Sequence, residues 1–229
     1  KEIKKVILTI DRMIKSYEGL YHLNNLIYLQ ASDAESLDLD FSYFKKLEDI
    51  SFYWTPKTQN FFDYKSLRII RVWKYKSKDK TLSEFSAFSN VEKLGIIQSN
   101  ITSIKGIKNL DRLKELELSY DLNLEINYDD LDFTLRNIEV LEIDTCKKVG
   151  LDFIKVFPNV KKLTLVKFQD ILELRPILEG LPMLEELFVG ETKILETDNS
   201  YYLDYPRIKK FFFAEKKYHK LKNRDLKKD

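Results

Sequence analysis

The 229-residue chain is 44% hydrophobic and 33% charged, which is typical of a folded globular protein and excludes a disordered chain. Its 39 Lys and Arg residues nearly balance 37 Asp and Glu residues, so overall charge excludes long-range attraction to nucleic acid or to an anionic membrane. The single cysteine, Cys146, excludes an internal disulfide, and with only two histidines beside it no structural zinc site is expected.

A short apolar motif recurs along the whole chain and predicts one strand per copy. Each copy reads apolar-x-x-apolar-x-apolar, and successive copies start 20 to 25 residues apart, which is too short for a strand–helix–strand unit of about 30 residues. The copies start at Ile3, Leu26, Leu47, Leu67, Val91, Leu113, Ile138, Val160, Leu184 and Ile208. We therefore predict about ten repeats in a single domain that spans residues 1–229.

A second pattern precedes each strand, where apolar residues recur at steps of three. One example is the series Ile104, Ile107, Leu110 and Leu113. A period of two in the strand and a period near three before it predict a strand, a turn and a short α- or 3₁₀-helical return. Because no such repeat can bury its apolar face alone, neighbouring repeats must stack into a one-dimensional solenoid.

The repeat that starts at Leu113 departs from this pattern at Asp132, where an apolar residue is expected. It is also the longest repeat, so we predict a local bulge or a longer helix there. Tyr128, Asp129, Asp130 and Asp132 are then exposed or capping residues. An acidic metal site is the alternative, but the segment lacks a spaced Asp, Asn and Gly loop.

The repeats resemble those of the leucine-rich-repeat superfamily, and within it the irregular bacterial, internalin-like (SDS22-like) class. Residues 91–110, VEKLGIIQSNITSIKGIKNL, carry the resemblance most clearly, and it extends over the whole chain. It implies an α/β solenoid: a leucine-rich-repeat horseshoe of about ten repeats, with a parallel β-sheet on the concave face and short α/3-10 helices on the convex face.

The same family places Asn or Cys at the ninth position of the repeat, where the side chain bonds to backbone in the turn. Here that ladder is degenerate, which predicts irregular curvature. The residues able to supply such bonds are Thr55, Ser99, Asp121, Cys146 and Thr192. We accordingly interpret Cys146 as a buried turn residue rather than a nucleophile.

No catalytic motif accompanies the repeats. The six glycines form no phosphate-binding loop or dinucleotide fingerprint, and there is no nucleophile-elbow sequence. Neither His22 nor His219 lies near a Ser or Cys in the repeat geometry. We predict that the chain is not an enzyme and has no catalytic residues, no cofactor, no metal and no small-molecule substrate.

The third, fifth, seventh and eighth positions of each repeat are expected to project from the concave face. Near the N-terminus they carry an aromatic zone on three adjacent strands. Its residues are Tyr28, Tyr53, Trp54 and Trp73, with Arg71 beside them. Solvent-facing Trp, Tyr and Arg dominate interface energetics, so we predict one partner-binding patch. The alternative is that flanking loops cover these rings and make them core.

A second, acidic zone lies on two neighbouring strands, the sixth and seventh. Its residues are Glu115, Glu117, Glu142 and Asp144, with Tyr120 beside them. Like charges this close repel, and a basic protein partner would relieve that repulsion. A merely solvated face is the alternative, and both remain open.

Residues 216–229 form a basic C-terminal tail or cap with Lys216, Lys217, Lys220, Lys222, Arg224, Lys227 and Lys228. A solvated cap is favoured over contact with nucleic acid, because the segment has one aromatic residue and no groove beside it. No apolar run approaches the roughly 18 residues of a membrane span.

These patterns predict a non-catalytic protein–protein recognition module that binds a protein partner through its concave face. Three alternatives stay open: an immunity or antagonist protein that covers a basic toxin or nuclease cleft, a secreted internalin-like adhesin, and the substrate-recognition part of a larger enzyme. The chain begins at Lys1 rather than Met, so we expect that an upstream segment has been removed. Localisation stays open between the cytoplasm, which is favoured, and secretion.

Overall fold

The structure is a computed structural model that describes residues 2–8, 16–31 and 39–226. It divides into two compact units, Lys1–Leu113 and Lys114–Asp229. We call them the N-terminal unit and the C-terminal unit and describe each by itself. The prediction of a single domain is not tested by this division and stays a prediction.

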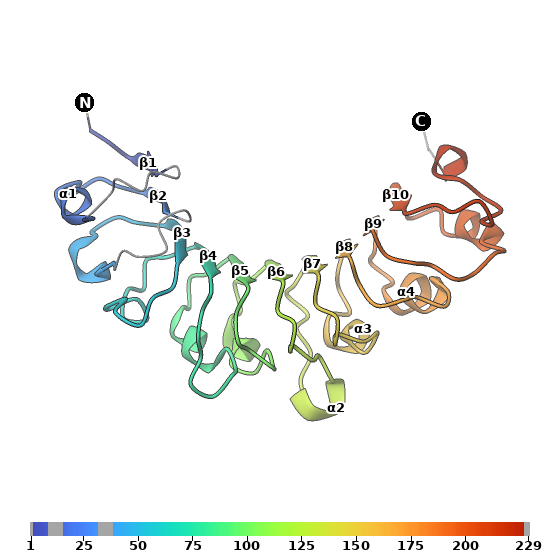
Figure 1. Cartoon of the computed structure of the whole chain (residues 1–229), viewed down its shortest axis with the longest axis horizontal. Coiled ribbons are helices and arrows are strands. Elements are labelled where there is room, and N and C mark those ends of the chain that lie inside the picture. The colour runs from blue at the N-terminus through green and yellow to red at the C-terminus, as the bar shows by residue number, and fades with distance from the viewer. Residues whose placement is uncertain (1, 9–15, 32–38, 227–229) are drawn as a thin grey trace. The chain divides into compact units, whose positions relative to one another are not determined.

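The described part of the N-terminal unit contains parallel strands that follow one another in chain order (Figure 1). The strands are β1 (Lys5–Ile7), β2 (Tyr28–Ala31), β3 (Asp49–Tyr53), β4 (Ile69–Trp73) and β5 (Lys93–Ile97). Single helical turns return the chain between them. These are α1 (Glu18–Tyr21) and the 3₁₀ turns η1 (Phe41–Tyr43), η2 (Ser83–Ala87) and η3 (Ile107–Asn109).

The described part of the C-terminal unit repeats this arrangement, with parallel strands in chain order. The strands are β6 (Glu115–Ser119), β7 (Val140–Asp144), β8 (Lys162–Val166), β9 (Glu186–Gly190) and β10 (Lys210–Phe213). The returns are α2 (Tyr128–Leu131), α3 (Phe153–Val156), α4 (Arg175–Gly180), η4 (Ser200–Asp204) and η5 (Asn223–Leu226). Within each unit the strands line one side and the helical turns lie on the other (Figure 1).

Each strand begins two residues after the first apolar residue of its motif, from Ile3 and Lys5 to Ile208 and Lys210. The reason is a hydrogen-bond pattern that repeats in most copies. The first apolar residue closes the preceding return, as when the Leu113 amide donates to the Leu110 carbonyl. The ladder starts one residue later, and the predicted strands are confirmed.

The core of each unit is made by the fourth and sixth residues of the motif. From β2 to β9 these residues are at most 2% exposed, and each buried Leu, Ile, Val or Phe contributes about 1.5–3 kcal/mol. At the outer strands Val6 and Phe211 are only half-buried. A strand with one neighbour cannot seal its apolar side as well as a strand with two.

A left-handed turn leaves most of the strands. Its residue is the eighth of the motif, and φ lies between 47° and 58° at Lys74, Gln98, Tyr120, Thr145, Lys167 and Glu191. Residues other than Gly adopt this conformation at a cost of roughly 1–2 kcal/mol. The recurrence therefore shows that the path of the backbone, rather than the local side chain, dictates the turn.

A pair of substitutions at Gln98 tests this turn. Gln98→Val is expected to lower the free energy of unfolding by about 1 kcal/mol, because a β-branched residue fits poorly where φ is positive. Gln98→Asn is expected to leave stability unchanged or slightly higher, because Asn tolerates this region. Urea unfolding followed by tryptophan fluorescence measures both variants. Equal losses in the two variants would contradict a role for backbone conformation.

The ninth residue of the motif supplies turn bonds only where it is small and polar. The Thr192 hydroxyl accepts from the Phe168 amide at 3.0 Å and donates to the Gly190 carbonyl at 3.1 Å. The Cys146 thiol donates to the Leu118 carbonyl at 3.4 Å. Tyr75 and Phe168 occupy the same column but are buried as core side chains. The predicted degenerate ladder has this physical basis.

The long repeat of the C-terminal unit contains no lengthened helix. α2 has four residues, as does α3, so the predicted longer helix is wrong. Asn127 caps α2 by accepting from the Asp129 amide at 3.0 Å, and Asp132 ends it with φ at 53°. Asp129, Asp130 and Asp132 are exposed, as expected of capping and surface residues.

The segment after β10 packs against that strand as a cap. The Asn223 side chain accepts from the Phe213 amide at 3.0 Å and donates to the Phe213 carbonyl at 2.9 Å. His219 is 3% exposed, and its ring accepts from the Lys216 amide through Nδ1. The assignment of residues 216–229 as a solvated cap stays a prediction, and Lys227 and Lys228 lie outside the described residues.

Candidate functional site

The side of the sheet opposite the core is formed by the third, fifth and seventh residues of each strand motif. Because side chains alternate along a strand, these residues share one surface in each unit. The strands pair in register, so equal positions align in rows, as Ser51 with Arg71 and Glu142 with Thr164. We call this surface the sheet face of the unit.

Two predicted aromatic residues meet on the sheet face of the N-terminal unit. Tyr53 and Trp73 are register partners on β3 and β4, and their ring centroids lie 6.0 Å apart. Both side chains are half-buried. The Lys74 ammonium lies 5.3 Å from the centroid of the Tyr53 ring, within the range of a cation–π contact. The pair offers an apolar surface with a polar rim.

Tyr28 does not belong to this pair, and its place in one partner-binding patch stays a prediction. Its register partner is Asp49, which precedes Tyr53 by four residues, or about 13 Å along a strand. The Tyr28 hydroxyl donates to Gln30 Oε1 at 3.0 Å. The sequence placed these rings on adjacent strands, but it did not show that Tyr28 lies at the start of its strand and Tyr53 at the end of the next one.

Trp54 also leaves the pair. Its ring contacts Tyr75, Phe62 and Phe61, with centroid distances of 5.2, 5.7 and 6.0 Å. Tyr75 and Phe61 are buried, so the indole lies at the edge of the core. Trp54 is nevertheless half-buried, like Tyr53 and Trp73, and its part in partner binding stays a prediction. Trp54 is an eighth residue without the left-handed turn.

Arg71 lies in the fifth-position row between Ser51 and Gly95, near a carboxylate that the sequence did not single out. This is Asp49, at the third position of β3. Burial raises the pKa of Asp49, although the positive charges of Arg71 and Lys5 act in the opposite direction. The sheet face of the N-terminal unit is therefore mixed in charge around Arg71.

The predicted acidic residues come together on the sheet face of the C-terminal unit. Glu117 and Glu142 are register partners, and adjacent strands lie about 4.8 Å apart. Glu115 and Asp144 extend the group to the rows on either side. Tyr120 is 41% exposed, and its amide donates to the Asp144 carbonyl at 2.8 Å. Like charges that face each other on a sheet repel one another, which costs stability.

The sequence reasoning missed an aromatic pair on the same face. Phe188 and Phe212 are register partners on β9 and β10, stacked at 4.7 Å with an interplanar angle of 11°. They line a groove of about 360 Å³ on this face. The available signal was the fifth-position column, where two consecutive repeats place Phe at an outward position.

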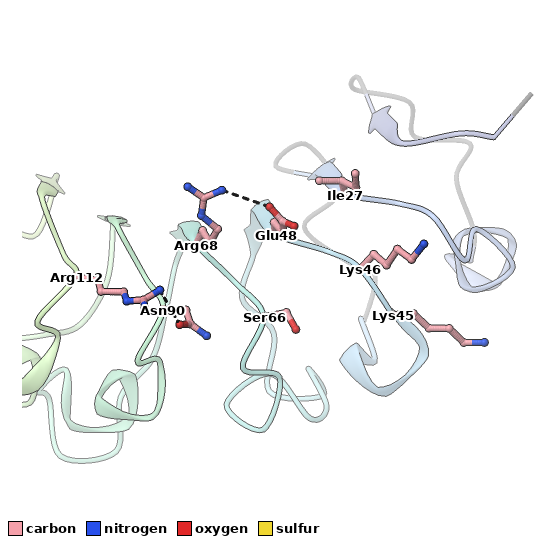
Figure 2. Close-up of a pocket in the computed structure, with 8 residues that line it drawn as sticks. All are labelled: Ile27, Lys45, Lys46, Glu48, Ser66, Arg68, Asn90 and Arg112. Atoms are coloured by element: carbon pink, nitrogen blue, oxygen red, sulfur yellow. Dashed lines mark hydrogen bonds and ion pairs between the residues drawn. The ribbon is translucent and has the colours of Figure 1, made fainter.

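A polar pocket of about 340 Å³ lies at the edge of the N-terminal unit where the strands begin (Figure 2). Arg68 joins Glu92 at 2.8 Å and Glu48 at 3.6 Å. The Arg112 guanidinium donates to Asn90 at 3.2 Å, while Lys45 points away from these groups in Figure 2. The polar groups of this pocket bond largely to one another, so we interpret it as a structural ion-pair edge.

The second position of the motif carries the same kind of edge in the C-terminal unit. Its charges alternate in sign from repeat to repeat, in the order Lys114, Glu139, Lys161, Glu185 and Lys209. Glu139 binds Lys161 at 2.8 Å and Lys114 at 3.4 Å, and Lys209 binds Glu185 at 2.6 Å. The Lys161 hydrogen bond lowers the pKa of Glu139. We call this row the second-position ladder.

Two further candidate reactive groups, Cys146 and His219, are buried. Burial raises the pKa of the Cys146 thiol to about 12, which keeps it protonated and poorly nucleophilic. The His219 ring packs in the C-terminal cap. Within residues 2–8, 16–31 and 39–226, no three His, Cys, Asp or Glu side chains group as metal ligands. The helices of these same segments include none with the length and hydropathy to cross a membrane.

Parallel strands in chain order, with short helical returns and stacked apolar columns, define an α/β solenoid of the leucine-rich-repeat type. A comparison with solved structures agrees. The chain is similar to an internalin (inlF) from Listeria monocytogenes, with a TM-score of 0.50 and 16% sequence identity over 90% of this chain. It spans 66% of that internalin chain. The likeness concerns the fold, and the predicted fold is confirmed.

No protein-family model matches the sequence, and no curated protein matches it.

Proposed function

We propose that this chain is a non-catalytic recognition module that binds a protein partner through its sheet face. The observation that carries the proposal is the character of that face. It presents half-buried aromatic and charged side chains in aligned rows, while the opposite side of each sheet is sealed as core. Trp, Tyr and Arg are the residue types that dominate interface energetics, and Tyr53, Arg71 and Trp73 lie there side by side.

A protein partner fits this face better than nucleic acid does. The acidic group on β6 and β7 would repel phosphates, whose neutralisation supplies most of the affinity in nucleic-acid binding. The raised pKa of Cys146 and the packed ring of His219 argue against acid–base or nucleophilic chemistry with these residues. The acidic group, Cys146 and His219 therefore support binding of a protein partner rather than catalysis.

The acidic group also supports a more specific candidate. A carboxylate cluster complements a basic surface and steers a basic partner towards it. We propose, as a second and narrower function, an immunity or antagonist role in which this face covers a basic cleft of a toxin or nuclease. Glu117 and Glu142, aligned at the centre of the group, would carry the largest share of that complementarity.

A binding experiment tests the proposal. A partner captured with the intact chain and identified by mass spectrometry is purified, and its affinity is measured by calorimetry. Trp73→Ala is expected to weaken binding about 30-fold, because truncating a central aromatic anchor costs about 2 kcal/mol or more. The double change of Glu117 and Glu142 to Lys is expected to slow association, most strongly at low salt.

The matched control reverses a charge away from the sheet face. Glu125 forms an exposed ion pair with Lys148 at 3.7 Å, outside the strands. Glu125→Lys therefore makes the same change of charge as each of the two substitutions at Glu117 and Glu142. Its affinity for the partner is expected to equal that of the parent chain. If Trp73→Ala and the Glu117 and Glu142 double variant also bind like the parent, the sheet face is not the binding surface.

A further inference from the structure

An exposed aromatic pair stands on the sheet face of the C-terminal unit. Phe188 is 41% exposed and Phe212 is 43% exposed, although Phe normally lies in the core. Their rings stack nearly in parallel and line the groove of about 360 Å³ together with Thr164 and Val140. Contiguous exposed apolar surface of this kind marks interaction sites.

A glycine sets the position of these rings. A side chain added at Gly190 would place its Cβ 2.5 Å from Phe188 Cε1 and 3.0 Å from Cζ. The edge of the Phe188 ring therefore reaches into the space that a side chain at position 190 would fill. Both stacked rings stay more than two-fifths exposed, so the pair is open to a partner.

The charges beside the groove satisfy one another. Glu186 binds Lys210 at 3.1 Å and Lys162 at 3.3 Å. The hydrogen bond from Lys210 lowers the pKa of Glu186, so the carboxylate stays ionised within this trio. The trio holds two lysines and one glutamate, so the excess acidic charge that attracts a basic partner lies in another part of the face.

That part is the acidic group, which shares a row with the aromatic pair. The fifth-position row runs across the unit in the order Glu117, Glu142, Thr164, Phe188 and Phe212. At about 4.8 Å per strand, Glu142 lies about 10 Å from Phe188, and Glu117 lies about 19 Å from Phe212. The outward positions of β6 and β7 hold Glu115, Glu117, Ser119, Val140, Glu142 and Asp144, with no Lys or Arg among them.

We propose that this face receives a protein segment of defined chemistry, which places a cationic side chain on Glu117 and Glu142 and an aromatic side chain on Phe188 and Phe212. The proposal rests on the proposed function and narrows it to the C-terminal unit and to this partner. In an extended segment the two side chains are three to six residues apart, because about 3.3 Å per residue must cover about 10–19 Å. The segment crosses the strands, with its basic end over β6 and β7.

Both halves of the face are needed for this specificity. Carboxylates attract Lys or Arg and repel an acidic segment, while the stacked rings accept an aromatic side chain in an offset or edge arrangement. An acidic segment with the same aromatic residue would meet like charge, and a basic segment without it would leave the rings exposed. Neither should compete with a segment that carries both.

Selection from a random 12-residue peptide library displayed on phage tests the proposal on the full chain. We expect the enriched peptides to carry Lys or Arg three to six residues from Phe, Tyr or Trp. A synthetic copy of the most enriched peptide is then titrated by calorimetry. Phe188→Ala with Phe212→Ala is expected to weaken it at least tenfold, and so is Glu117→Gln with Glu142→Gln.

Two further variants test whether the position of the Phe188 ring matters, rather than only its presence. Gly190→Ala keeps both rings and all charges but displaces Phe188, so it is expected to weaken the peptide severalfold. Met183→Ala is the control. It removes an exposed side chain outside the strands, and the affinity for the peptide is expected to stay unchanged. Circular dichroism confirms that each variant is folded.

The outcomes divide clearly. Enriched peptides without a basic residue, no enrichment, or unchanged binding to the Phe188 and Phe212 double variant would each overturn the proposal. Binding that is lost in Trp73→Ala but kept in both double variants would also overturn it, while leaving recognition through the N-terminal sheet face intact. Binding insensitive to all of these variants would count against the proposed function as well.

Discussion

Replacing Phe61 with alanine is expected to lower the free energy of unfolding by about 3–5 kcal/mol. Phe61 is 2% exposed and lies after β3, where it joins a cluster of aromatic rings in the core of the N-terminal unit. Its ring contacts those of Phe62, Phe41, Phe88, Phe52, Trp54 and Phe85 at centroid distances of 4.9 to 6.2 Å. Alanine would leave a cavity that stacked neighbouring repeats cannot close.

The measurement can be confined to one unit. Both tryptophans of the chain, Trp54 and Trp73, lie in the N-terminal unit, so fluorescence reports its unfolding in urea. Circular dichroism reports both units together. Phe61→Leu is the companion variant and should cost less than about 1.5 kcal/mol, because it keeps most of the volume. A loss below about 1 kcal/mol in Phe61→Ala would contradict the packing described for this core.

Gly106→Ala is expected to cost about 2–4 kcal/mol, although it adds one methyl group at a turn. Gly106 precedes η3 with φ at 104°, where any other residue is strained. An added Cβ would also lie 2.3 Å from the Ser83 Cα atom and 2.5 Å from the Leu82 carbonyl carbon. These are backbone atoms of the preceding repeat, and the Leu82 amide bonds to the Lys105 carbonyl at 2.9 Å, so the two turns cannot separate freely.

Gly19→Ala is the matched control for this substitution. Gly19 lies inside α1, and an added Cβ would meet no atom within 4 Å. Alanine there is expected to stabilise the chain by up to about 1 kcal/mol, because it loses less backbone entropy than Gly in a helix. Destabilisation of similar size in both variants, measured by urea unfolding, would show that the close approach at Gly106 is not the cause.

The fold was predictable from the sequence because its signal is repeated. One strand motif is ambiguous, but ten copies with apolar residues at matching places leave no other period. The constant offset between Leu113 and Glu115, or between Leu184 and Glu186, follows from the same repetition. An ambiguous strand assignment in one copy is resolved by the other copies, whereas a segment of a non-repetitive protein has no such copies for comparison.

The candidate site was less predictable, because a position in the repeat does not fix the direction of its side chain. The acidic residues Glu117 and Glu142 fell on one face since alternation along a strand is strict. Trp54 packs against Tyr75 instead of joining the Tyr53 and Trp73 pair, because the eighth position lies beyond the alternating part of the strand. Phe188 and Phe212 were in the right column, but a single sequence does not show that Gly190 leaves room for the Phe188 ring.

The second-position ladder has a consequence for how such a chain can change length. Because Lys114, Glu139, Lys161, Glu185 and Lys209 alternate in sign, removal of one repeat from this series would bring two like charges together, whereas removal of two would restore the alternation. Gain or loss of repeats in the C-terminal unit is therefore favoured in even numbers. The preference for an even number comes from the charges of the second-position ladder and does not depend on the core that every repeat shares.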